Sequence, residues 1–215
     1  AKSISIFLWK QSSRQFTEGG GFGIFLPSER YLGLFDDTDE RFDASVRTKF
    51  YDKNGNLLTS AADPEYIAPH CKKYEDYDRV MDAGASSKNI YFIRYADLIL
   101  LYAECLLAEN DLAGAKQQVI RVRNRAKVST PITASNNTEM LDFIYEERMR
   151  ELGMEGWRRM DLIRRGADYF AAQVDKYNPF AKGNVQPYHA FYPIPTNEIN
   201  MNDGIGAEDQ NEGYK

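Results

Sequence analysis

Acidic and basic side chains alternate through YEERMRELGMEGWRRMDLIRRG, residues 145–166. Two carboxylates set across a cleft at a suitable separation would form the acid and base pair of a glycosidase. Glu147 and Glu151 are the candidates, but they stand four residues apart and would share one face of a helix. Arginine neighbours lower the pKa of a carboxylate, whereas a general acid needs a raised pKa. The pattern favours a network of ion pairs that locks helices together, with a carbohydrate-cleaving enzyme as the alternative.

The spacing within this stretch suggests particular ion pairs. Glu146 and Arg150 are four residues apart, in the orientation that favours an intrahelical pair. Glu147 and Glu151 would repel each other unless arginines intervene. We expect that role to fall to the nearby arginines, which are Arg148, Arg158, Arg159 and Arg164.

Other catalytic and metal-binding arrangements are weakly indicated. His70 and His189 are remote from each other and lack partners at metal-ligand spacing, so each is expected at the surface or hydrogen-bonded. The acidic run DDTDE (36–40) could hold calcium, but it lacks the later glutamate of an EF-hand loop, and a turn is favoured. The sequence therefore predicts no catalytic residue, no metal site and no cofactor.

Aromatic side chains form the candidate ligand site. The chain has 14 tyrosines and 12 phenylalanines, more than a small helical core needs. Exposed rings on a loop held by a rigid scaffold could stack on a flat apolar ligand face, such as the underside of a sugar ring. For any single ring, a place in the core is the competing interpretation. The candidates lie in or around the glycine-rich run EGGGFG: Trp9, Phe22, Phe25 and Tyr31.

Composition narrows the classes of partner. A net charge of -5 and a pI near 5.2 argue against nucleic acid, which requires clustered positive charge. No apolar run approaches the roughly 20 residues that span a bilayer. Cys71 and Cys105 could pair in an oxidising compartment, although two unpaired and mostly buried thiols are expected.

The chain divides into three parts. Residues 1–90 are predicted to be loop-rich with short strands, at SISIFLW and on either side of the Asn54-Gly55 turn, and to form the ligand face. Residues 91–170 show helical periodicity, and residues 171–215 form an irregular, proline-punctuated tail expected to pack on the helices. The fold class is therefore mainly α, with tetratricopeptide-like helix hairpins and a partly β, ligand-facing region.

Residues 94–127 are predicted to form a helix hairpin close to the 34-residue tetratricopeptide unit. Its first helix is apolar on two faces, so we expect neighbours on both. Asp111 suits the N-cap of the second helix, and Ala103 and Ala115 stand where the two helices would approach.

A second hairpin is predicted over residues 138–170. Thr138 is its expected cap, and Gly153 and Gly156 are expected to end its first helix before Trp157 begins the next.

Several blocks, taken in order, resemble the SusD/RagB family. Asp39 and Arg41, in FDDTDERF, resemble that family's aspartate-x-arginine block. The helix motifs that match are structural in that family. Its ligand contacts follow no fixed motif, so the resemblance indicates the segment around Trp9 as a ligand region without assigning individual contacts. The matching blocks resemble the family's C-terminal region over roughly 91–214 and read RYADLILLYAECL, VIRVRNRA, IYEERMRELGMEGWRRMDLIRRG, FYPIPTNEINMN and QNEGY.

The resemblance implies a mostly helical, surface-exposed lipoprotein on the extracellular face of the outer membrane of Bacteroidetes-type bacteria. Such a protein binds glycans or other nutrients for a SusC-like TonB-dependent transporter and is not an enzyme. Family members are more than twice this length and begin with a signal peptide and a lipidated cysteine. We therefore expect this chain to match a C-terminal portion, without the lipid anchor or the first two helical repeats.

Two functions follow from these observations. Glycan binding for import is favoured by the aromatic, glycine-rich segment before Asp39, which a pure scaffold would not need. The alternative is a tetratricopeptide-like scaffold that docks the transporter and holds no sugar site in this portion.

Overall fold

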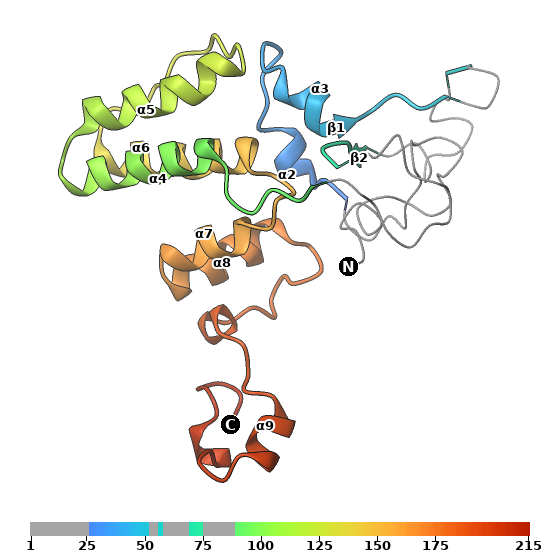
Figure 1. Ribbon diagram of the computed structural model, residues 1–215, viewed down its shortest axis with the longest axis vertical. Helices are drawn as coiled ribbons and strands as arrows, with labels where there is room; N and C mark the ends of the chain where they lie inside the picture. Colours follow the sequence, from blue (N-terminus) through green and yellow to red (C-terminus); the bar gives the residue numbers. More distant parts are fainter. Residues whose placement is uncertain (1–25, 52–55, 58–68, 75–88) are drawn as a thin grey trace. The chain divides into compact units, whose positions relative to one another are not determined.

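The computed structural model is predominantly helical, which confirms the mainly α fold class (Figure 1). The residues it describes are 26–51, 56–57, 69–74 and 89–215. The chain divides into two compact units, Ala1–Glu155 and Gly156–Lys215. Across the described ranges, no helix is both long and apolar enough to cross a bilayer.

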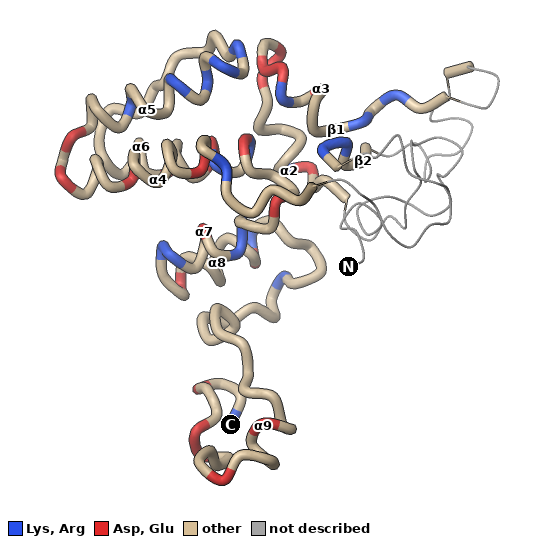
Figure 2. Tube along the Cα trace, viewed as in Figure 1, with Lys and Arg blue, Asp and Glu red and all other residues tan. Residues whose placement is uncertain are grey.

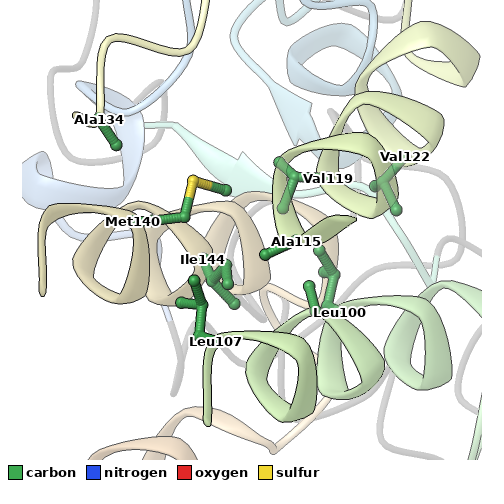
Figure 3. Close-up of a cluster of buried hydrophobic side chains, with 9 residues drawn as sticks. Leu100, Leu107, Ala115, Val119, Val122, Ala134, Met140 and Ile144 are labelled. Atoms are coloured by element: carbon green, nitrogen blue, oxygen red, sulfur yellow. The ribbon is translucent and has the colours of Figure 1, made fainter. Parts of the chain in front are cut away.

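Three helices form the core of the first unit: α4 (Tyr95–Ala108), α5 (Leu112–Arg125) and α6 (Asn137–Glu151). The predicted hairpin is α4 with α5, and α6 packs against both (Figure 1). Ala103 and Ala115 are fully buried, as their predicted place between the helices requires. Side chains from all three helices converge in one apolar cluster, with Leu100 and Leu107 from α4, Val119 from α5, and Met140 and Ile144 from α6 among its members (Figure 3).

Short polar side chains set the ends of these helices. Asn110 adopts a φ of 62°, in the left-handed region that asparagine tolerates, and so reverses the chain after α4. Asp111 caps α5 as predicted, because its carboxylate accepts a hydrogen bond from Gly114 N at 2.8 Å. The prediction for α6 was wrong: Thr138 lies inside the helix, and Asn136 is the cap, accepting from Glu139 N at 3.0 Å.

The outer face of α4 departs from the expectation that both apolar faces are covered. Leu100 and its neighbours on one face are buried, whereas Tyr95, Leu98 and Tyr102 are 68%, 52% and 54% exposed. The described residues therefore cover one apolar face of α4 and leave the other open.

Short elements of the N-terminal segment pack against the C-terminal end of α6. They are α2 (Glu29–Leu32), α3 (Arg41–Ser45), β1 (Val46–Arg47) and β2 (His70–Cys71), and β1 pairs antiparallel with β2. Tyr31, Leu34 and Val46 form a small core that packs against Met149 of α6 and Met154 beyond it. The predicted strand 3–9 and the predicted Asn54-Gly55 turn lie outside the described residues. Tyr51 and Leu57, which flank Asn54-Gly55 in the sequence, form an antiparallel bridge.

The second unit contains α7 (Arg158–Arg164), α8 (Ala167–Tyr177), the 3₁₀ turn η2 (Pro187–Ala190), α9 (Thr196–Met201) and the 3₁₀ turn η3 (Ala207–Asp209). Both α7 and η2 pack on α8, around Leu162, Phe170 and Ala190.

This arrangement differs from the predicted second hairpin. The helix α6 ends at Glu151 and packs on α4 and α5, while α7 pairs with α8. The chain breaks between α6 and α7 because Met154 and Gly156 take positive φ values of 67° and 88°. The irregular tail starts after Tyr177, later than residue 171, because apolar residues continue at helical spacing through Phe170 and Val174.

One arginine fastens the tail to the helices of the second unit. The guanidinium of Arg159 stacks on the ring of Phe170 at 5.0 Å and on that of Tyr192 at 4.4 Å. The same group donates to the carbonyl oxygens of His189 at 2.8 Å and Ala190 at 3.1 Å. Residues 189–192 are thereby held against α7 and α8.

Two leucines on α4 provide a matched test of the core. We expect Leu100→Ala to lower the free energy of unfolding by about 2–5 kcal/mol, because Leu100 is fully buried and its loss leaves a cavity. Leu98→Ala removes the same atoms from a side chain that is 52% exposed, and should cost less than about 1 kcal/mol. Urea unfolding of both variants measures the difference, and equal losses would contradict the burial assigned here.

Candidate functional site

Glu147 and Glu151, one turn apart on α6, meet the same arginine. Arg41 Nη1 donates to Glu147 Oε1 at 2.7 Å and to Glu151 Oε2 at 3.1 Å. Asp39 holds the other edge of that guanidinium, with 2.8 Å from Arg41 Nε to Asp39 Oδ1 and 2.7 Å from Arg41 Nη2 to Asp39 Oδ2. The Asp39 and Arg41 block thus joins the N-terminal segment to α6, in the bidentate geometry that suits arginine.

Further arginines complete the shell around Glu147. Arg150, one turn along α6, donates from Nε to Glu147 Oε2 at 3.0 Å, and Arg123 of α5 approaches that oxygen at 3.3 Å. Arg123 also donates to the Thr130 carbonyl and hydroxyl oxygens. Glu147 therefore joins α5, α6 and the Asp39–Arg41 block at one point.

Glu151 has a different set of partners. Its carboxylate accepts from Arg94 at 2.9 Å and from Arg125 at 2.8 Å. Arg94 also binds Glu155 at 2.8 Å, and Lys73 reaches the same carboxylate at 2.6 Å. These contacts tie the start of α4 and the β2 region to the C-terminal end of α6.

Burial and charge together define what these carboxylates can do. The side chains of Glu147 and Glu151 are 0% and 2% exposed. Burial alone would raise the pKa of Glu151, but Arg94, Arg125 and Arg41 outweigh it and hold that pKa below its usual value. A buried carboxylate kept ionised by arginines cannot act as a general acid, so the ion-pair interpretation is confirmed.

The individual pairs predicted from spacing were wrong. Arg150 binds Glu147 instead of Glu146, and Glu146 pairs with Arg30 of α2. Arg148 pairs with Asp97 of α4 at 2.7 Å. The arginines that neutralise the two glutamates come mostly from distant segments, and the signals that could have found them are the Asp39–Arg41 block and the run RVRNR.

The acidic run 36–40 is a hydrogen-bonded turn beside the arginine-rich end of α5 (Figure 2). Asp36 accepts from the backbone and hydroxyl of Thr38 and from the Thr130 hydroxyl at 2.6 Å. Partial burial works in the opposite direction, but these bonds and Arg123 lower the pKa of Asp36 to about 2. Within the described ranges no cluster of histidine, cysteine, aspartate and glutamate is arranged to hold a metal ion.

The structure separates the four aromatic candidates. Tyr31 is 4% exposed and packs edge-on against Phe35 with ring centroids 5.1 Å apart. Burial raises the pKa of its hydroxyl. Tyr31 therefore belongs to the core and offers no ring face to a ligand, because α6 and the following turn cover it. Trp9, Phe22 and Phe25 lie outside the described residues and stay predictions.

The contacts of the two histidines are with neighbouring protein groups, and the two cysteines are present as thiols. His70 is buried with its ring 5.0 Å from that of Phe50, and His189 Nδ1 accepts from Gln186 N at 2.9 Å. Neither cysteine is in a disulfide. Cys71 is buried as expected, whereas Cys105 is exposed because it lies toward the open side of α4.

A comparison with protein families assigns this architecture. The family model that describes the SusD family matches residues 27–214, a range that includes both the Asp39–Arg41 block and α6. The chain belongs to the SusD family.

Curated relatives in the SusD family share about a third of their aligned residues with this chain. SusD-like protein P25 of Formosa agariphila is 34% identical over 134 residues, which is 60% of this chain and 25% of that protein. The starch-binding protein SusD of Bacteroides thetaiotaomicron is 32% identical over 142 residues, 63% of this chain and 23% of that protein. The alignments thus span about a quarter of each curated relative.

Solved structures share the fold. NanU of B. fragilis matches 99% of this chain and 47% of its own, with a TM-score of 0.66 and 23% identity. The surface glycan-binding protein A of Bacteroides thetaiotaomicron, solved in complex with laminarihexaose, matches 98% of this chain and 45% of its own, with a TM-score of 0.67 and 22% identity. At these identities the likeness establishes the SusD fold.

Two adjacent glutamates test the buried network. We expect Glu147→Gln to lower the free energy of unfolding by about 3–5 kcal/mol, because it leaves Arg123 and Arg150 buried without the carboxylate that pairs with them. Glu146→Gln makes the same chemical change on a side chain that is 40% exposed, and should cost less than about 1 kcal/mol. Urea unfolding distinguishes the two, and a neutral Glu147→Gln would show that the network does not hold the fold.

Acid should weaken the fold through carboxylates whose pKa is depressed. The pKa of Asp36 is about 2 in the folded protein, against an ordinary 3.8, and the pKa of Glu151 is also lowered. Both residues therefore bind fewer protons when the protein is folded than when it is unfolded. The stabilisation from Asp36 is present above its unfolded pKa and is lost as the pH falls from about 4 to about 2, and the stabilisation from Glu151 is likewise lost as the pH falls below its unfolded pKa. Urea unfolding across this range should show declining stability, with a shallower decline for Asp36→Asn.

Asp37→Asn is the matched control, because Asp37 is exposed and does not accept the threonine hydrogen bonds made by Asp36. If Asp36→Asn and Asp37→Asn alter the acid dependence equally, the hydrogen bonds from Thr38 and Thr130 are not its cause.

Proposed function

We propose that this chain belongs to a non-catalytic protein that binds glycans, or other nutrients, at the outer face of the outer membrane for a TonB-dependent transporter. The observation that carries the proposal is the SusD family match over residues 27–214. It is supported by two relatives, one named a starch-binding protein and one a glycan-binding protein solved with an oligosaccharide.

The surroundings of the acidic residues support binding without cleavage. Glycoside hydrolysis needs one carboxyl group with a raised pKa and a second across a cleft. Glu147 and Glu151 are instead buried, bound to one shared arginine, and in the case of Glu151 lowered in pKa. Both side chains accept hydrogen bonds that hold the helices and the N-terminal segment together.

The proposed ligand face is the aromatic, glycine-rich region that precedes α2. Trp9, Phe22 and Phe25 are its candidate contacts, and Tyr31 is no longer among them. The buried network fixes the segment that follows this region to α6 through Arg41. A loop attached to such a rigid support is suited to present rings to a ligand.

A second candidate function is a scaffold that docks the transporter. It is favoured by the open apolar face of α4, where Tyr95, Leu98 and Tyr102 are more than half exposed. Large apolar side chains grouped on one helix face are typical of protein contacts. Under this alternative, substitutions at Trp9 would leave every binding activity intact.

Affinity electrophoresis in gels that contain glucans tests the proposal. We expect neutral polysaccharides, laminarin and starch among them, to retard the chain, and Trp9→Ala to reduce the retardation because a stacking ring is removed. Phe180→Ala is the control, since Phe180 is a 95% exposed aromatic residue of the second unit.

Chromatography of the sugars after incubation provides the catalytic readout, and unchanged chain lengths are expected. Release of shorter sugars would contradict a non-catalytic role. A folded chain that no glycan retards would contradict glycan binding by this portion and favour the scaffold alternative.

A further inference from the structure

A cleft lies in the second unit, whereas the residues nominated above belong to the first. The cleft has a volume of about 700 Å³, within the roughly 300–1,000 Å³ of small-ligand sites. Every described residue that lines it belongs to Gly156–Lys215, which is one compact unit. Its walls come from the start of α8, from η2 and the residue after it, and from the chain near residue 212.

The aromatic wall of the cleft is held in place. The Tyr188 ring lies 4.2 Å from that of His189 and 5.1 Å, edge-on, from that of Tyr214. Gly213, with a φ of 86°, passes so close that a Cβ there would stand 2.2 Å from the Tyr188 ring. Tyr214 in turn donates from its hydroxyl to the Phe191 carbonyl oxygen at 3.1 Å. A ligand would meet these groups already ordered, which lowers the entropic cost of binding.

The lining residues near 212 are polar, and hydrogen bonds hold this segment in place. Asn211 donates from its side chain to the Tyr192 carbonyl oxygen at 2.7 Å. Gln210 bonds both the N–H and the carbonyl of Ile194, which anchors the segment next to Asn211. Glu212 then follows in the lining, and it makes no hydrogen bond or ion pair to another described residue. Its carboxylate is available to accept hydrogen bonds.

The start of α8 is also part of the lining. The lining includes Ala167, the first residue of α8, and the N-cap Gly166 supplies no side-chain acceptor for the first amide groups of the helix. Lysine and arginine are absent from the described residues that line the cleft, and Glu212 would repel an anion. A neutral hydroxyl group fits both features, because it donates to the carboxylate and accepts from an amide.

The side chain of Phe191 supplies an apolar surface in the lining of the cleft. Phe191 is among the lining residues and is 59% exposed, so an accessible apolar side chain accompanies the polar groups of the lining. A flat apolar face edged by hydroxyl groups is the surface of a pyranose ring, and aromatic residues pair with such faces.

We propose that this cleft binds a neutral sugar residue, which stacks on Phe191 and hydrogen-bonds through its hydroxyl groups to Glu212. The ligand class rests on the proposed glycan binding, while the location is independent of the Trp9 region. A second set of contacts of this kind would raise the avidity for a glycan that engaged both sets at once.

Fluorine NMR of the whole chain, labelled with 4-fluorophenylalanine, reports directly on the cleft. The Phe191 signal is assigned by its loss in Phe191→Leu, and the Phe180 signal serves as the internal control. Titration with laminarihexaose and with maltohexaose should shift the Phe191 signal saturably and leave Phe180 unmoved. In Glu212→Ala the apparent Kd should rise about tenfold or more, because a hydrogen bond to a charged group is lost.

The outcomes separate this assignment from the proposed function. If glucans retard the chain in gels while neither oligosaccharide moves the Phe191 signal, the cleft assignment is overturned and glycan binding stands. If Phe191 responds but Trp9→Ala leaves retardation unchanged, the cleft assignment is supported and the nomination of Trp9 fails. A shift produced by a neutral peptide and by neither sugar would overturn the sugar assignment.

Discussion

The fold of the first unit depends on one buried carboxylate. Glu147 has no exposure, and its two oxygens are satisfied by arginines from α3, α5 and α6 itself. An ionised group so far from water is tolerated only when its charge and lone pairs are fully matched. Because the three arginines come from three different segments, matching them also helps to fix where those segments lie. The apolar cluster of α4, α5 and α6 supplies stability, and the ion network supplies position.

The sequence predicts regular features and fails where a feature is long-range. The α4–α5 hairpin follows from apolar periodicity, the Asp111 cap and the small residues at 103 and 115. The structural role of Glu147 and Glu151 follows from their arginine-rich surroundings. Their actual partners do not, because Arg41 lies 106 residues away from Glu147 and ion pairs across such a distance leave no periodic trace. The packing of α7 with α8 was missed for a different reason, because the chain breaks at Gly166, whose φ is 106°, inside a stretch that was predicted as one helix.

For the candidate sites, too, the sequence indicates some features and leaves others to the structure. An exposed ring and a core ring look alike in sequence, so Tyr31 could not be told from a binding residue until its neighbours from α6 were known. The cleft at Phe191 had no sequence signal at all. Its walls come from residues near 167, 188 and 212, in a tail whose prolines and polar residues indicate only irregular chain. What joins them is the stacking of Arg159 and the hydrogen bonds of Gln210 and Tyr214.

The separation between Arg41 and its carboxylates also bears on the order of events during synthesis. A chain made from its N-terminus presents Arg41 and Asp39 long before α6 exists, and 106 residues must follow before Glu147 can meet the arginine. Until then the segment around α3 has lost no entropy to closing that loop and has gained none of its ion pairs. The segment around α3 is therefore translated before α6 and gains these ion pairs only after α6 has been made.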